Sequence, residues 1–143
     1  MHRPYVRAIL AVALLAMGAC SNDTLSSLTT PTNPTIFTDT FTGTLSQNGS
    51  FTHSFTTASL GAVTVTIVSL VPNSSQIVGL SLGVWNGSAC STSPQTGGSS
   101  SDTATSGSSI TLNASAAGSL CVRLYDVGFI TAPVLYTLQV THP

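Results

Sequence analysis

Polar and apolar residues alternate with a period of two along most of the chain after residue 36. In the stretch 37–44, two phenylalanines and an aspartate alternate with threonines, and in 51–56 ring-bearing residues alternate with serine and threonine. Alternation of this kind predicts strands that turn one face toward a core. Between the two stretches lies Asn48-Gly49, a strong turn signal because both residues tolerate a positive φ. We therefore expect the two strands to form a β-hairpin.

Five further segments carry strand signals. The clearest is 61–70, where β-branched residues dominate and Val63, Val65 and Ile67 share one face. In 77–85, aliphatic residues alternate with glycine and serine, so the outer face of that strand carries little side-chain volume. The remaining segments are 108–113, 118–127 and 134–141.

The segment 86–107 is mostly serine, threonine and glycine without periodicity, so we expect a long loop or irregular connections there. No sustained helical pattern follows the first twenty residues. Seven or eight strands with regular turns predict an all-β fold, an antiparallel β-sandwich over residues 36–142. A closed barrel is the structural alternative.

The first twenty residues have the pattern of an export signal. Residues 1–7 carry two arginines, 8–16 are an apolar run, and small residues precede Cys20. The apolar run is too short for a membrane span, which needs about twenty residues. The stretch 15–20 (LAMGAC) resembles a bacterial lipobox, which implies removal of a signal peptide over 1–19 and acylation of Cys20. The alternative is an ordinary signal, which would give a secreted protein with a spare thiol.

Residues 20–35 are rich in serine, threonine, asparagine and proline, and we predict a disordered tether there. The chain has three cysteines. Acylation of Cys20 leaves Cys90 and Cys121, for which a disulfide is expected in an oxidising compartment. That bond would close a loop of about thirty residues, worth roughly 3.5 kcal/mol in the chain-entropy model.

Charged side chains are scarce. They make up 5 % of the 143 residues, lysine and glutamate are absent, and the formal net charge is −1. Once the N-terminal segment is set aside only Arg123 remains as a cation, which argues against a nucleic-acid partner. Catalytic and metal sites need converging charged groups, so we predict no enzyme, no metal and no cofactor. We interpret His53, between Phe51 and Phe55, as a packed and hydrogen-bonded residue.

Two aromatic residues are candidates for ligand contact. Trp85 and Tyr125 fall on the sides of their strands opposite the aliphatic residues. Exposed aromatic rings stack on sugars or anchor partner proteins. Packing at the edge of the core is the simpler alternative for both.

The strand segments together resemble the bacterial pre-peptidase C-terminal domain. The resemblance covers about residues 37–141 and rests on 41–45, 50–55, 61–67, 80–85, 118–126 and 136–140. It implies a compact jelly-roll-like β-sandwich, found attached to secreted enzymes, especially peptidases, and in stand-alone surface proteins. Some relatives bind calcium through clustered acidic residues near the domain start, but Asp39 stands alone in that region, so we expect no calcium site.

These observations predict a non-enzymatic, lipid-anchored β-sandwich of the bacterial cell envelope. Its expected role is a binding or adhesion module toward a polysaccharide, a protein or a surface. The alternative is a structural accessory subunit of an envelope protein complex. The N-terminal lipid would provide the membrane contact, whereas a secreted protein is the alternative location.

Overall fold

Nine strands and one short 3₁₀ helix make up the part of the chain that the computed structural model describes, residues 33–143. The predicted signal peptide, the predicted acylation site Cys20 and the predicted tether as far as residue 32 lie outside these residues. The strands are β1 (Phe37–Leu45), β2 (Ser50–Thr57), β3 (Gly61–Val71), β4 (Val78–Trp85), β5 (Cys90–Ser91), β6 (Ser99–Ala104), β7 (Ser109–Ala114), β8 (Gly118–Tyr125) and β9 (Val134–His142), and the 3₁₀ helix η1 is Pro94–Thr96.

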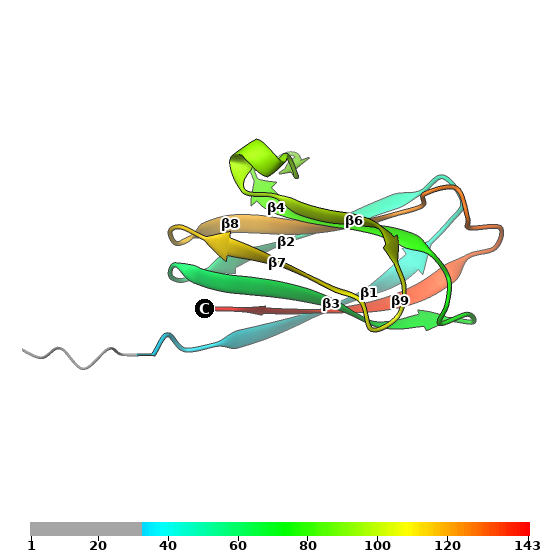
Figure 1. Cartoon of the computed structure of the whole chain (residues 1–143), viewed down its shortest axis with the longest axis horizontal. Coiled ribbons are helices and arrows are strands. Elements are labelled where there is room, and N and C mark those ends of the chain that lie inside the picture. The colour runs from blue at the N-terminus through cyan, green and yellow to red at the C-terminus, as the bar shows by residue number, and fades with distance from the viewer. Residues whose placement is uncertain (1–32) are drawn as a thin grey trace, which may run out of the picture. The chain divides into compact units, whose positions relative to one another are not determined.

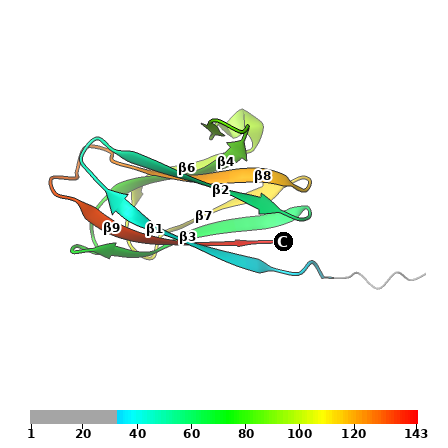
Figure 2. The same cartoon turned by 180° about the vertical axis from the view of Figure 1, so that it is seen from behind.

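The strands form two antiparallel sheets packed face to face (Figures 1 and 2). The first sheet has the order β1-β9-β3-β7, and the second has the order β2-β8-β4-β5, with β6 also paired to β4. From β1 to β4 each strand lies in the opposite sheet to the one before it. If β5 and β6 are taken as one interrupted edge strand, this is the eight-strand order of a jelly roll. The predicted β-sandwich is confirmed.

The core fills the space between the sheets with aliphatic side chains from alternate positions. Val63, Val65 and Ile67 are fully buried, on the face that the sequence pattern predicts. Leu138 and Val140 of β9 face the same interior from the centre of the first sheet. Each such side chain contributes about 1.5–3 kcal/mol when it is removed from water.

The predicted hairpin between β1 and β2 is wrong. The turn itself is present, since the Gly49 amide donates to the Ser46 carbonyl at 2.9 Å and Asn48 adopts φ 54°. However, β1 pairs with β9 and β2 pairs with β8, so the turn carries the chain from one sheet to the other. A tight turn fixes a local reversal, but it does not decide whether the flanking strands bond to each other.

The segment 86–107 is more regular than predicted, because β5, η1 and β6 lie within it. This raises the number of strands from the expected seven or eight to nine. The sequence of β6, Ser99–Ala104, shows no apolar alternation, and its strand form comes from the ladder with β4. Long-range pairing therefore orders a stretch that local composition marks as loop.

The outer face of the first sheet is a regular array of hydroxyl groups, here called the threonine face. Across the four strands, Thr38, Thr141, Thr64 and Thr111 stand opposite one another in register. The Thr64 and Thr111 hydroxyl oxygens lie 3.0 Å apart. The next row repeats the arrangement with Thr40, Gln139, Thr66 and Ser109.

Candidate functional site

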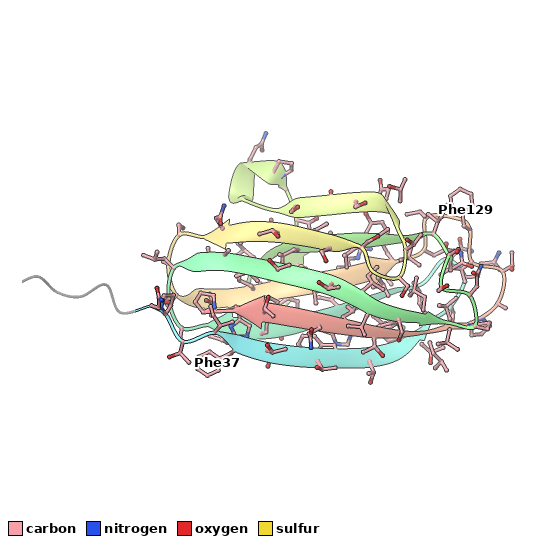
Figure 3. The ribbon with its side chains drawn as sticks, turned by 60° about the horizontal axis from the view of Figure 1, so that its bottom comes forward. Phe37 and Phe129 are labelled. Carbon is pink, nitrogen blue, oxygen red and sulfur yellow. A yellow bond between two sulfur atoms is a disulfide. The ribbon has the colours of Figure 1, made fainter. Side chains whose placement is uncertain are left out.

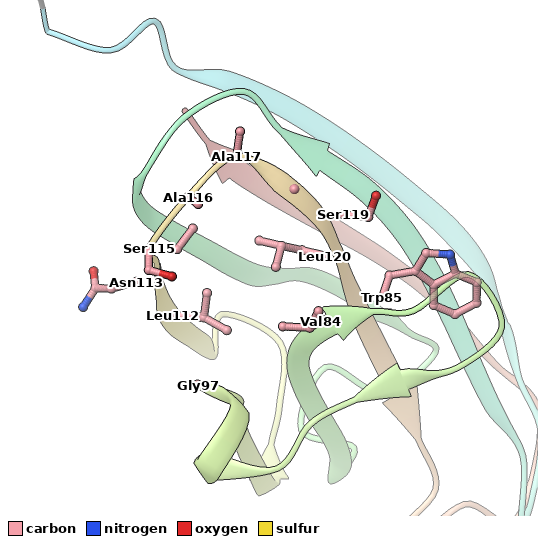
Figure 4. A pocket seen from close by; sticks show the side chains of 12 residues that line it. Val84, Trp85, Gly97, Leu112, Asn113, Ser115, Ala116, Ala117, Ser119 and Leu120 are labelled. Carbon is pink, nitrogen blue, oxygen red and sulfur yellow. The ribbon is translucent and has the colours of Figure 1, made fainter.

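A cleft opens at one end of the sandwich, where the end of β4, the 3₁₀ helix and the β7–β8 turn meet (Figure 4). Its volume is about 640 Å³. It is lined by Val84, Trp85, Gly97, Leu112, Asn113, Ala114, Ser115, Ala116, Ala117, Gly118, Ser119 and Leu120. The same end of the first sheet holds the start of β1 and the end of β9.

The lining of the cleft is apolar in the middle and hydroxyl-bearing at the rim. The side chains of Val84, Leu112 and Leu120 converge, while Ser115 and Ser119 stand at the margin (Figure 4). Val84 is 39 % exposed although the six residues before it in β4 are buried, because it faces this opening. None of the lining residues carries an ionisable side chain. Such a cleft suits an uncharged ligand with apolar surface and hydroxyl groups.

Gly83 of β4 lets the backbone at Ser91 and Thr92 lie close against that strand, and Gly98 lets the segment 92–98 fold back against Thr92. A Cβ added at Gly83 would lie 2.0 Å from the Ser91 carbonyl oxygen, and one added at Gly98 would lie 2.4 Å from that of Thr92. Gly97 ends the 3₁₀ helix at φ 82°, a left-handed conformation that favours glycine. The wall of the cleft therefore depends on backbone packing that larger residues would obstruct.

A disulfide fastens this wall to the second sheet. Cys90 of β5 and Cys121 of β8 are joined, 31 residues apart in sequence, which agrees with the pairing expected from the cysteine count. Cys121 is fully buried and pairs in register with Gly83 on β4. The bond holds β5, which pairs with the cleft residue Trp85, against the centre of the sheet.

Trp85 lies at the mouth of the cleft and is half-buried. Its indole ring points away from the converging side chains of Val84 and Leu120 (Figure 4). The ring therefore forms an outer margin of the cleft, and a ligand that contacts it would extend beyond the aliphatic floor.

Tyr125 lies at the other end of the second sheet and does not share a site with Trp85. It pairs with Gly79, and Trp85 lies six residues farther along β4, about 20 Å away. The Tyr125 hydroxyl donates to a carboxylate oxygen of Asp102, and the Arg123 guanidinium carbon lies 5.2 Å from its ring centroid. Burial, and then the Asp102 hydrogen bond and charge, raise the pKa of Tyr125 to about 12. The hydroxyl is thus engaged within the protein.

His53 has the contacts of a packed residue. Its Nε2 lies 2.8 Å from the Tyr136 hydroxyl, and its ring stacks on Phe41 with centroids 4.7 Å apart. Burial lowers the pKa of His53. The second histidine of the domain, His142, lies 3.2 Å from Asp39. Within residues 33–143, no three His, Cys, Asp or Glu side chains gather as metal ligands would.

The sequence gives no indication that the β7–β8 turn borders a site. Residues 114–118 carry neither charge nor aromatic groups, so no chemical signal marks them. Their only feature is small size, which lets the turn border an opening.

No protein-family model matches the chain, and neither does any curated protein. Among the described residues, no helix has the length and hydrophobicity to cross a membrane.

Proposed function

We propose that this protein is a non-enzymatic, lipid-anchored binding module of the bacterial cell envelope that recognises an uncharged polysaccharide at the cleft beside Trp85. The observation that carries the proposal is the cleft itself, which combines an aliphatic floor, hydroxyl groups and an indole margin without any ionisable group. The lipobox-like stretch ending at Cys20 supports the anchor.

Sugars match this lining chemically. The apolar face of a pyranose ring stacks on an aromatic side chain, while its hydroxyl groups exchange hydrogen bonds with small polar groups. Trp85 supplies the ring, and Ser115 and Ser119 supply hydroxyl groups at the rim. A cleft with no cation gives no compensation for a buried carboxylate or sulfate, so a neutral polysaccharide is favoured over an acidic one.

Two further observations support a binding role. The resemblance to the pre-peptidase C-terminal domain implies a jelly-roll sandwich, and the strand order of this domain is of that type. Three polar groups of the described domain that could take part in catalysis are engaged in structural contacts: His53 with Tyr136, His142 with Asp39, and Asp102 with Tyr125.

The test is binding of neutral polysaccharides by the full chain, first on a glycan array and then by titration calorimetry. Loss of the indole in Trp85→Ala should weaken binding about tenfold, since an aromatic contact contributes about 0.5–1.5 kcal/mol beyond its area. Tyr125→Phe is the matched control, because it alters the other candidate aromatic residue and leaves the cleft intact. Absence of binding to any neutral glycan, or equal loss in both variants, would contradict the proposal.

A role as accessory subunit of an envelope complex is the second candidate. It is favoured by exposed apolar side chains at the end opposite the cleft. Val71 and Leu135 stand side by side in register and are 50 % and 57 % exposed. Phe129, at the end of the sandwich opposite Phe37 (Figure 3), is 59 % exposed. If a protein partner binds there, Leu135→Asp should abolish its co-purification while Trp85→Ala leaves it unchanged.

A further inference from the structure

One side of the first sheet ends in a long strand edge that no other described strand covers. β1 pairs with β9 over nine consecutive residues without a bulge, and it is the outermost strand (Figure 3). Proteins usually protect such an edge with lysine, proline, a bulge or a covering segment. β1 contains neither lysine nor proline, and Asp39, its one charged residue, lies 3.2 Å from His142 of β9.

We propose that β1 pairs antiparallel with β1 of a second copy of this chain, about a two-fold axis through Phe41. The backbone groups along the open edge match those of another extended strand. A two-fold contact requires a surface that is complementary to itself. The sequence of β1 meets this requirement when Phe41 of one copy stands opposite Phe41 of the other.

In the two-fold register centred on Phe41, the threonines meet one another. Thr40 stands opposite Thr42 of the second copy, and Thr38 stands opposite Thr44. Asp39 stands opposite Gly43, so the two carboxylates are kept apart. Like charges directly opposite each other would destabilise the pairing, and this register avoids them. It also continues the threonine face from one copy into the other.

Aromatic side chains lie along the side of the sandwich formed by β1 and β2, and pairing with a second copy would bury part of their apolar surface. Phe37 is 50 % exposed and Phe51, on the neighbouring edge strand β2, is 45 % exposed. Phe41 is partly buried against His53 and Phe55, with ring centroids 4.7 Å and 6.5 Å away. A second copy would cover these rings, and removal of apolar surface from water favours association.

The other open edges fit a second copy less well. β7 offers only six residues. β6 also has six residues, pairs with β4 through an irregular register, and carries the exposed carboxylate of Asp102. β2 is eight residues long and lies on the same side as β1, so a dimer through β1 would place it near its symmetry mate.

Cysteine cross-linking in bacterial membranes that contain the full chain tests the register. Residues opposite each other in an antiparallel pair have Cα atoms about 4.5–5.5 Å apart, within the range of a disulfide. The double variant Thr40→Cys/Thr42→Cys should therefore run at twice the monomer mass on a non-reducing gel, as should Thr38→Cys/Thr44→Cys. Reduction should return both to the monomer mass.

Thr38→Cys/Thr40→Cys is the matched control for this experiment. It places the same number of thiols on the same face of β1 with the same spacing as Thr40→Cys/Thr42→Cys, but out of the two-fold register. It should remain monomeric. No cross-link in the in-register variants, or equal cross-linking in the control, would overturn the proposal.

A second measurement does not depend on added thiols. Thr40→Lys/Thr42→Lys places like charges opposite each other across the proposed contact, and it should raise the dimer dissociation constant of the purified full chain in detergent at least tenfold. Ser109→Lys/Thr111→Lys adds the same charge on β7, away from the contact, and should leave that constant unchanged. A monomer at every concentration of the unaltered chain would also overturn the proposal.

Discussion

The outer faces of the two sheets are built from the same alternating pattern, yet the first is open, whereas the second is covered along β4, and this part is here called the covered face. On the first sheet, outward residues such as Thr40 and Gln139 are exposed. On the second sheet, the outward residues Gly79, Ser81 and Gly83 of β4 are buried. The covering groups are the Tyr125 ring over Gly79 and the backbone around Ser91 over Gly83.

This difference shows that alternation identifies which residues share a face but does not determine what lies above that face. Glycine at positions 79 and 83 leaves room for the ring and for the backbone to approach β4. The disulfide and β5 are then held close to the sheet. The covered face should therefore be sensitive to substitution, whereas the threonine face should tolerate it.

The largest effect is expected from loss of the disulfide on the covered face. The double variant Cys90→Ser/Cys121→Ala should lower the free energy of unfolding by about 3.5 kcal/mol. Without the disulfide, the loop between these two residues regains conformational entropy in the unfolded chain. Urea denaturation followed by circular dichroism measures this value. A matched comparison adds reductant to the unaltered protein. Stability that is unchanged in both experiments would show that β5 is held by the β4 ladder alone.

Gly83→Ala should have the next largest effect. The added methyl group would lie 2.0 Å from the Ser91 carbonyl oxygen, which is backbone and can yield only if β5 shifts. Overpacking of this kind costs about 2–3 kcal/mol. The same denaturation experiment measures it, with Gly87→Ala as a comparison at an open position where an added Cβ meets no atom within 4 Å. Gly87 has φ 98°, so its variant reports backbone strain without a clash.

On the threonine face, Thr64→Ala should cost only about 0.5 kcal/mol. The hydroxyl contact with Thr111 is exposed, and cross-strand pairs of this kind contribute about 0.2–1 kcal/mol. Urea denaturation again gives the value. A decrease in the free energy of unfolding as large as that of Gly83→Ala would show that the threonine face is as sensitive to substitution as the covered face.

The smallest expected change is in the titration of Tyr125. In Asp102→Asn the charge is removed, so the pKa of Tyr125 should fall below about 12, yet stay above 10.0 because burial remains. In the unaltered protein, stability should decrease as the pH rises from 10.0 toward about 12, since the unfolded tyrosine loses its proton first. Absorbance titration of the phenolate measures the pKa in both proteins. An unchanged value in Asp102→Asn would assign the shift to burial alone.

Much of the fold can be predicted from the sequence, because strand faces follow from side-chain alternation. The buried face of β3 and the sandwich class are examples. The partner of β1 cannot be predicted in this way. Asn48-Gly49 specifies a turn, and both a hairpin and a crossing between sheets satisfy it locally. The choice depends on which strand, β2 or β9, packs beside β1 in the complete core.

The candidate site is harder to predict than the fold. Trp85 carries a chemical signal, and the sequence identifies it. Part of the rest of the cleft comes from small, uncharged residues such as Ala116 and Ala117, in the β7–β8 turn, which is distant from β4 in sequence. Such residues acquire a role only when the fold brings their segments together. The covered face of β4 has the same origin, because the groups over it come from β5 and β8.

The ladder between β1 and β9 also determines how the domain bears mechanical load. The N-terminal end of β1 meets the C-terminal end of β9, where Phe37 stands opposite His142. Hydrogen bonds in an antiparallel ladder run perpendicular to the strands. A pull on the chain before Phe37, directed along β1, therefore slides the whole strand past β9 and loads the bonds together rather than one at a time. Shear of this kind arises when the opposing force acts at the other end of the sandwich, where Val71 and Leu135 lie, and not when it acts at the cleft, which is at the same end as the start of β1.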